Sequence, residues 1–145
     1  MFQFQILNLP ESFTIDETRI SRIFELVSLS VDISQLGILN IAFLADDEIQ
    51  SLNREHRGND STTDVLSFHY FDDFSDLSIA DTAGEIILSE SRIISQAQEH
   101  GHSRERECEI LVLHSILHII GFDHETNEEY ADMWAVEGGL RKKLG

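Results

Sequence analysis

Cysteine is almost absent from this chain of 145 residues, which contains Cys108 alone. A single cysteine excludes a disulfide within the chain and fits the reducing conditions of a cytoplasm. Cys108 lies six residues before His114, so on a helix its side chain points away from that histidine. We therefore expect a small core residue at this position and not a metal ligand.

Long apolar segments are missing as well. The longest one is interrupted by His114 and His118 and is shorter than the ~20 residues that a membrane-spanning helix needs. The first six residues, Met-Phe-Gln-Phe-Gln-Ile, lack the cationic segment that precedes the apolar core of a secretory signal. Together with a hydrophobic content of 41%, these features predict a soluble, cytoplasmic protein without a membrane partner.

Positive charge is scarce, with 10 lysines and arginines against 27 acidic residues and a net charge of −17. A general nucleic-acid coat protein needs a basic surface to bind phosphates, so this balance argues against that class. The arginines are unevenly placed, however: Arg54 and Arg57 lie together, and Arg104 and Arg106 precede a cluster of histidines. A small cationic area beside a divalent metal is still able to bind a phosphate group.

The apolar pattern predicts strands and helices within a single domain spanning residues 1–145. Alternation at Phe2, Phe4 and Ile6 indicates a first strand, and further strands are expected at 37–44, 65–68 and 85–88. Helices are expected from a capping box at 14–17 through 27, from an N-cap at Asp46 through 52, and at 89–101, 103–120 and 126–140. Because the two types do not alternate strictly, we predict the α+β class. Its single mixed sheet has about four strands, and about five helices pack mainly on one face.

The most informative motif is His114-Ser-Ile-Leu-His118-Ile-Ile-Gly121-Phe-Asp-His124. Positions four apart share one helix face with Cβ atoms ~5–6 Å apart, so two imidazoles can bind one ion at the ~2.0–2.1 Å Zn–N distance. Gly121 is expected to end the helix, since glycine enters the left-handed conformation without a Cβ penalty, and the reversed chain can bring His124 back as a third ligand. We predict one Zn²⁺ at the end of a buried helix, although imidazole also suits other divalent transition metals. An open fourth position is typical of catalytic zinc.

The same spacing matches the protease pattern H-E-x-x-H-x-x-G-x-x-H, in which glutamate follows the first histidine and acts as general base. Here that position is Ser115, whose hydroxyl cannot take a proton from water as a carboxylate does. A protease would therefore need a different mechanism. On such an apolar helix a lone histidine would favour an ordinary core residue, but three at ligand spacing favour a metal site.

Several segments together resemble the YbeY family of bacterial ribosomal-RNA maturation endoribonucleases. They are Leu52-Asn-Arg-Glu-His-Arg57-Gly-Asn-Asp60-Ser-Thr-Thr-Asp64-Val-Leu-Ser-Phe68, Gly84-Glu-Ile-Ile, Arg106-Glu107 and the histidine motif. The resemblance covers roughly Leu44 to His124, in the right order. It implies an α+β fold with a zinc site and cleavage of single-stranded RNA during 3′-end maturation of small-subunit ribosomal RNA. A part in ribosome quality control, and ribosomal RNA and the small ribosomal subunit as partners, are also implied.

The resemblance further implies that His114, His118 and His124 hold the zinc and that Arg57 lies near it. Glu85 stands where the family usually has aspartate. Three other positions depart from the family pattern: serine replaces the usual glycine at 115, asparagine a common lysine at 59, and histidine a common proline at 69. The missing lysine removes one phosphate contact.

A zinc ion with an open position activates water and polarises a phosphoryl oxygen. A planar guanidinium can hold two phosphoryl oxygens at once, and we expect Arg57 to do so, with Arg54 as a weaker second. Asp123, Asp64 and Glu85 are candidates for orienting a zinc-bound water or an imidazole.

Three functions remain under comparison at this point. The first is a zinc-dependent endoribonuclease, with Arg57 and His114 as its catalytic residues. The second is a metalloprotease of non-metzincin mechanism. The third is a non-enzymatic ribosome-assembly factor whose zinc is structural, which the acidic composition favours.

Overall fold

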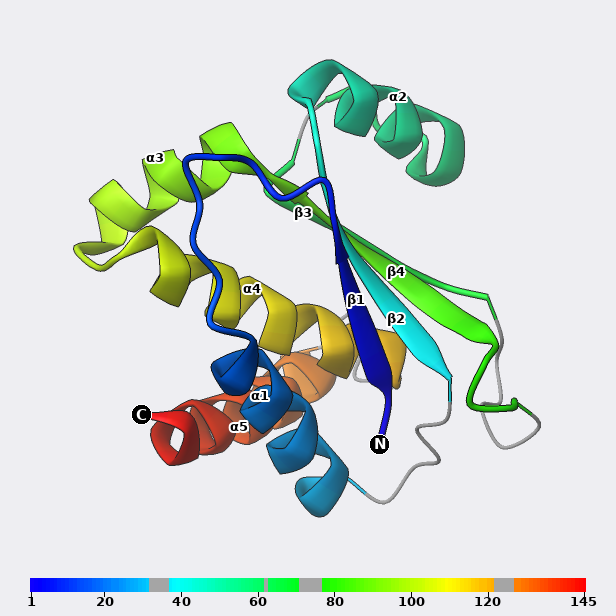
Figure 1. The fold of residues 1–145 in the computed structure, drawn as a ribbon, viewed down its shortest axis with the longest axis vertical. Helices are drawn as coiled ribbons and strands as arrows, with labels where there is room; N and C mark the ends of the chain where they lie inside the picture. Colours follow the sequence, from blue (N-terminus) through cyan, green and yellow to red (C-terminus); the bar gives the residue numbers. More distant parts are fainter. Residues whose placement is uncertain (32–36, 62, 71–76, 122–126) are drawn as a thin grey trace.

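The computed structural model describes residues 1–31, 37–61, 63–70, 77–121 and 127–145, without the side chains of 127–131. Figure 1 shows the elements in chain order. They are β1 (Gln3–Leu7), α1 (Glu17–Ser30), β2 (Ile38–Leu44), α2 (Asp46–Arg57), β3 (Val65–His69), β4 (Thr82–Ser89), α3 (Glu90–His100), α4 (Arg104–Ile119) and α5 (Asn127–Leu144). The predicted α+β class is confirmed.

The four strands form one mixed sheet in the order β1-β2-β4-β3. β1, β2 and β4 run parallel, whereas β3 pairs with β4 in the antiparallel direction. In this register Ile41 lies beside Ile86, and Leu66 lies beside Ile87. The arrangement agrees with the single mixed sheet that the sequence predicted.

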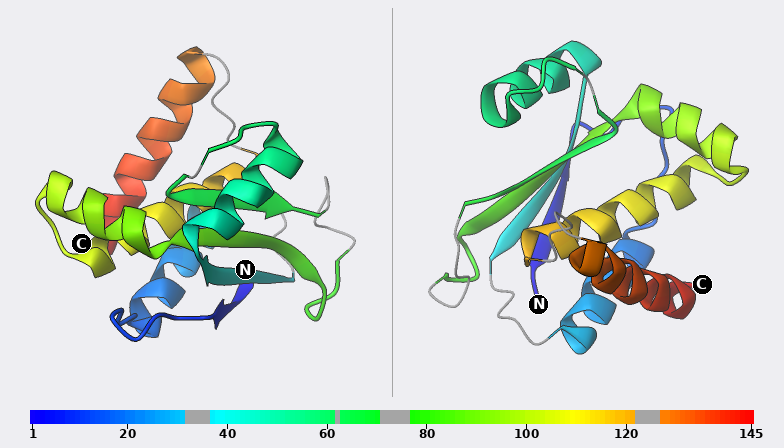
Figure 2. Two further views of the ribbon diagram at one scale, coloured as in Figure 1. Left: turned by 90° about the horizontal axis from the view of Figure 1, so that it is seen from above. Right: turned by 180° about the vertical axis from the view of Figure 1, so that it is seen from behind.

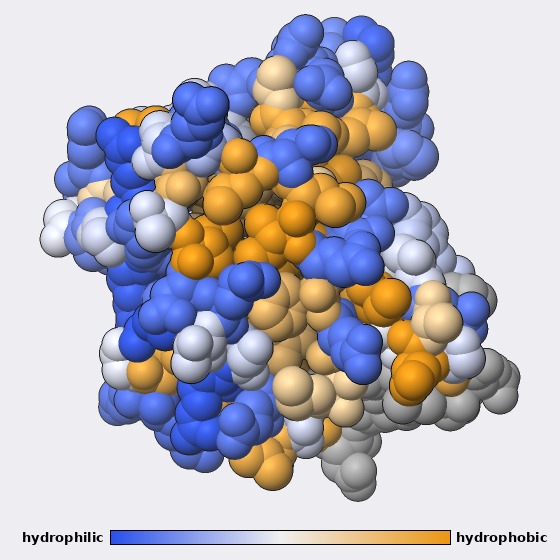
Figure 3. Space-filling model, viewed as in Figure 1, coloured by the Kyte–Doolittle hydropathy of each residue, from blue (hydrophilic) through white to orange (hydrophobic). Residues whose placement is uncertain are grey.

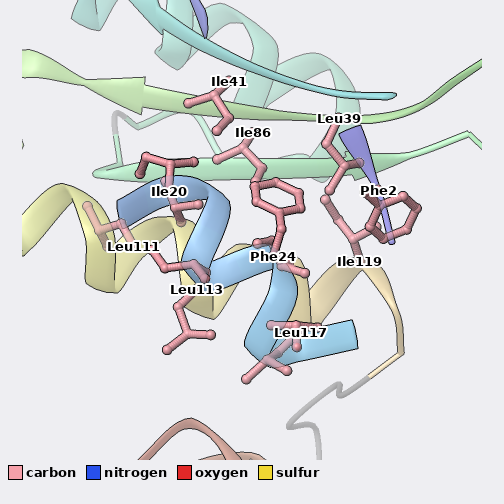
Figure 4. Packing of buried hydrophobic residues seen from close by; sticks show 14 of the residues in the cluster. Phe2, Ile20, Phe24, Leu39, Ile41, Ile86, Leu111, Leu113, Leu117 and Ile119 are labelled. Carbon is pink, nitrogen blue, oxygen red and sulfur yellow. The ribbon is translucent and has the colours of Figure 1, made fainter. Parts of the chain in front are cut away.

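Most helices cover one face of the sheet, as predicted. The views in Figure 2 show α2 on one side of the sheet and α1, α3, α4 and α5 on the other. The larger core lies on the second side, where Figure 4 shows Phe24 of α1 facing Ile86 of β4. A smaller cluster of Ile49, Leu66 and Ile87 fills the space under α2. Successive residues of β4, Ile86 and Ile87, thus face opposite layers, as strand geometry requires.

Two predicted helix caps are wrong. α1 begins at Glu17, and its N-cap is Asp16, which accepts a hydrogen bond from the backbone N–H of Thr18 at 3.0 Å. The expected capping box at 14–17 is not used, because this carboxylate already satisfies an amide that the helix leaves free. At α2 the N-cap is Ala45, without a side-chain cap.

Asp46 has a tertiary role in place of the predicted cap. Its two carboxylate oxygens accept hydrogen bonds from the hydroxyls of Ser89 and Ser91, both at 2.6 Å, and these bonds lower its pKa. The contact arises because Leu44 pairs with Ser89 in the parallel register, so the chain after β2 lies beside the start of α3. Asp46 thereby fastens α2 to α3.

The remaining expectations for α3 and α4 are confirmed. Ser89 and Ser103 are the N-caps of the two helices, each accepting a backbone N–H with its hydroxyl. α4 ends at Ile119, and Gly121 follows with a φ of 106°, in the conformation that favours glycine. Cys108 is 1% exposed in the core, and burial raises the pKa of its thiol to about 12.

Polar and apolar residues separate on the molecular surface. On the face drawn in Figure 3, hydrophilic residues cover α2 and α3, whereas apolar residues gather between them. Among the described residues, no helix combines the length and the apolar character needed to cross a bilayer.

Candidate metal centre and adjoining cavities

The last two turns of α4 bring two of the predicted metal ligands together. The Nε2 atoms of His114 and His118 are 3.1 Å apart, and their ring centroids are 4.7 Å apart. A tetrahedral ion with Zn–N bonds of ~2.0–2.1 Å separates two ligand nitrogens by about 3.4 Å. The pair therefore fits a shared ion with only a small adjustment. The third expected ligand, His124, and the neighbouring Asp123 lie outside the described residues.

A carboxylate that sequence reasoning missed contacts the first histidine. The Oε2 atom of Glu137, on α5, lies 3.1 Å from Nδ1 of His114, and Glu137 is 7% exposed. Because a carboxylate only accepts, this contact favours the tautomer with the proton on Nδ1, which leaves a lone pair on Nε2, the atom that faces His118. A signal for this residue was present: Met133, Glu137 and Leu140 share one buried helix face, where a charge is out of place.

A cavity of about 500 Å³ opens beside the two histidines. Arg57, Asn59 and Asp64 line it together with His114 and His118, so residues of α2 and of the loop before β3 meet the end of α4. The tertiary structure thus places four of the predicted site residues, Arg57, Asp64, His114 and His118, around one space.

Arg57 is held in a defined orientation on this wall. Its Nη2 donates to the backbone oxygen of Ser67 at 2.7 Å, and its guanidinium carbon lies 5.9 Å from the ring centroid of Phe68. A cation over an aromatic face is attracted by the ring quadrupole. Arg54 behaves differently, because it pairs with Asp60 at 3.7 Å and is not among the described residues lining the cavity.

The fold places the two other carboxylate candidates, Asp64 and Glu85, in different surroundings. Oδ1 of Asp64 accepts from the backbone N–H of Val65 at 2.9 Å and from the Thr63 hydroxyl at 3.1 Å, and Asp64 lines the cavity. Glu85 instead accepts a hydrogen bond from the hydroxyl of Tyr70 and is not among the described lining residues.

Ser115, where the protease pattern has glutamate, is buried between the two histidines in the sequence of α4. It is 1% exposed, and its Oγ makes no hydrogen bond within the described part of the chain. It lines the same cavity as His114 and His118.

A second cavity, of about 570 Å³, extends from His114 and Glu137 along α4 to its other end. There it is lined by His100, His102 and Glu107, whose ligand atoms all lie within 4.8 Å of one another. This group could hold a metal ion. The sequence reasoning did not single it out, since the three residues belong to a helix end, a turn and the next helix.

Comparison with known proteins identifies the family. The family model described as "Endoribonuclease YbeY" matches residues 5–145. The chain belongs to the YbeY family. The endoribonuclease YbeY of Carboxydothermus hydrogenoformans is 38% identical over 142 residues, covering 97% of this chain and 96% of that protein. The endoribonuclease YbeY of Symbiobacterium thermophilum is 44% identical over 111 residues, covering 74% and 71%.

A solved structure supports the same assignment. The solution structure of TM1509 from Thermotoga maritima matches with a TM-score of 0.65 at 26% identity, covering 98% of this chain and 89% of that one. The family resemblance predicted from the sequence motifs is therefore confirmed.

Proposed function

We propose that this protein is a zinc-dependent endoribonuclease that cleaves single-stranded RNA. The observation that carries the proposal is the pair of facing Nε2 atoms of His114 and His118, 3.1 Å apart, in a cavity that Arg57 also lines. His124 would be the third ligand, as the sequence motif implies. The names of the relatives, which are endoribonucleases, support RNA as the substrate.

The residues around the cavity suggest how the reaction is assisted. When bound, the ion supplies Lewis-acid polarisation of a phosphoryl oxygen and a water of lowered pKa. Glu137 holds the proton on Nδ1 of His114, which keeps the ligand nitrogen of that ring unprotonated. Arg57 uses one N–H on Ser67 and retains other donors for the oxygens of a scissile phosphate.

Two further residues have supporting roles in this proposal. Asp64 keeps its second carboxylate oxygen available to orient a water in the cavity, because within the described part of the chain both hydrogen bonds to this side chain are accepted by Oδ1. Arg54, three residues before Arg57 on α2, binds the RNA backbone more weakly, since its guanidinium is shared with Asp60.

The biological substrate follows from the family resemblance. We propose cleavage near the 3′ end of small-subunit ribosomal RNA, a part in ribosome quality control, and action in the cytoplasm on the small ribosomal subunit. The net charge of −17 favours one alternative, a non-enzymatic ribosome-assembly factor with a structural zinc. Family membership favours RNA over a peptide substrate, which leaves the metalloprotease alternative without support.

Cleavage by a metal-stripped and zinc-reloaded protein tests the proposal. The substrates are a single-stranded fragment of the ribosomal RNA 3′ region and a duplex of the same sequence. We expect the wild type to cleave the single strand, His114→Ala to lose the activity, and Arg22→Ala, which changes an exposed ion pair on α1, to keep it. Equal cleavage by wild type and His114→Ala would identify a contaminating nuclease. Binding without cleavage by the zinc-loaded wild type would favour the assembly factor.

A further inference from the structure

The turn between α3 and α4 lies at the opposite end of α4 from His114 and His118 (Figure 1), and it brings two histidines and a glutamate together. His100 is the last residue of α3, His102 lies in the turn, and Glu107 lies in the first turn of α4. We propose that these three side chains form a second binding site for a divalent transition-metal ion. The site is distinct from the one at His114 and His118 and goes beyond the proposed RNA cleavage.

The ligand atoms converge closely. Nδ1 of His100 lies 3.1 Å from Oε2 of Glu107, and Nε2 of His102 is within hydrogen-bond distance of the same oxygen. The two imidazole rings are 5.5 Å apart between centroids and inclined by 61°, so each presents a nitrogen to the carboxylate without stacking on the other. A tetrahedral ion with bonds of ~2.0–2.1 Å spaces its ligand atoms about 3.4 Å apart. Small movements outward therefore open a coordination position between them.

The backbone fixes both ends of this turn. Gly101 adopts a φ of 72° at the C-cap of α3, and the backbone N–H of His102 donates to the oxygen of Ala97 at 3.1 Å. On the other side, the Ser103 hydroxyl caps α4 by accepting the N–H of Arg106 at 3.1 Å. Because both neighbours of His102 are anchored, little backbone entropy remains to be lost when an ion orders the ligands.

Burial and charge favour a cation at this position. Glu107 is 2% exposed, and among the described residues its side chain has hydrogen-bond contacts with His100 and His102 alone. A buried carboxylate needs a compensating charge or several hydrogen bonds. Two imidazoles and one carboxylate form a donor set that suits zinc and other first-row divalent ions. The cavity of about 570 Å³ beside them leaves room for water to complete the coordination.

The second ion would act separately from the first. Glu107 precedes His114 by seven residues, which is ~10 Å along a helix axis, whereas the ions of a two-metal catalytic site are ~3.5–4 Å apart. The new site therefore does not serve the reacting phosphate directly. It braces the turn between α3 and α4 and forms the far end of the cavity that reaches His114.

Counting bound zinc tests the proposal. The full-length protein is stripped with a chelator, reloaded with excess Zn²⁺, freed of unbound metal and measured by mass spectrometry for metal per chain. We expect about two ions in the wild type and about one in the His100→Ala/His102→Ala double variant. His114→Ala should also hold about one, and His69→Ala, which removes an exposed histidine at the end of β3, should hold as many as the wild type.

Two results would overturn the second site. One is a double variant that binds as much zinc as the wild type. The other is a wild type with a single ion that is lost in His114→Ala. In that case His100, His102 and Glu107 would form a hydrogen-bonded cluster without a metal. If the double variant does not fold, Glu107→Gln decides by the same count, since it keeps the side-chain shape and removes the anionic ligand. Loss of RNA cleavage in any variant bears on the proposed function, whereas the second site is judged by the ion count alone.

Discussion

The two ends of α4 bring similar residues together but use the carboxylate differently. At the C-terminal end, the imidazoles of His114 and His118 face each other, and Glu137 contacts the far nitrogen of His114. A carboxylate in this position can orient the imidazole as a ligand. It leaves the space between the two rings open for an ion.

At the N-terminal end, the carboxylate lies between the rings. His100 and His102 both face one oxygen of Glu107, so the glutamate would itself be a ligand. Residue types alone do not distinguish the two clusters, since each has two histidines and one buried glutamate. The position of the carboxylate relative to the imidazoles distinguishes them.

The largest expected effect concerns Arg57, which lines the cavity beside His114 and His118 and is not among the described residues that line the other cavity. Arg57→Ala should lower kcat for RNA cleavage by ~10²–10³-fold, because a positioned donor to the developing charge is lost. Arg57→Lys should restore part of the activity, since an ammonium supplies charge without the planar fork. Steady-state kinetics measure both, and an equal loss in Arg54→Ala would show that the two arginines act only as a general cationic area.

Replacing each of the two glutamates by glutamine, in separate variants, tests the comparison directly. Glu137→Gln should weaken zinc binding at the first site or cleavage by ~10–100-fold, because the partner of a metal-binding histidine loses its charge. Glu107→Gln should remove the second ion and leave the cleavage rate nearly unchanged. The measurements are zinc titration and kcat for each variant. The comparison fails if Glu107→Gln impairs cleavage as strongly as Glu137→Gln does.

A smaller effect is expected at Ser115. Its buried hydroxyl lacks a partner within the described residues, and such a group costs ~1–3 kcal/mol. Ser115→Ala should therefore raise Tm by about 2–12 °C, helped by the better helix propensity of alanine. Ser115→Gly, which introduces the usual family residue, should be less stable than Ser115→Ala by ~1 kcal/mol. Thermal unfolding of the metal-free proteins checks the order, and a lower Tm for Ser115→Ala would reveal a partner for the hydroxyl.

The smallest effect concerns Asp46, which fastens α2 to α3 and touches neither cluster. Its pKa is lowered below the ordinary value of 3.8 by hydrogen bonds from Ser89 and Ser91. A lowered folded-state pKa means that the stabilisation is present above pH ~4 and is lost as the pH falls through the folded value. The Tm difference between wild type and Asp46→Asn should therefore shrink from pH 7 to pH 3. A difference independent of pH would mean that the carboxylate charge is unimportant.

Most elements of the fold could be predicted from local pattern. Alternation at Phe2, Phe4 and Ile6 correctly indicated β1, and Ser89 and Ser103 correctly marked the starts of α3 and α4. The expected cap at Asp46 was wrong because two hydroxyls from a distant segment compete for its carboxylate. A propensity rule has no information about such a partner.

The candidate site likewise has one part that the sequence predicts and one part that depends on tertiary packing. Helical periodicity places His114 and His118 on one face, so their pairing follows from the sequence by itself, because the contact lies within one helix. Arg57 and Glu137 come from α2 and α5, and only the packing of those helices against α4 brings them to the histidines.

The sequence by itself therefore determined the family, the α+β class and the pair of imidazoles at the end of α4. These features depend on motifs and on spacing over a few residues. The tertiary structure decided which carboxylate orients His114, which wall carries Arg57, and that a second cluster forms at the start of α4. Those contacts join separate elements, and in a folded chain such distances are set by packing and register instead of by the spacing of residues along the sequence.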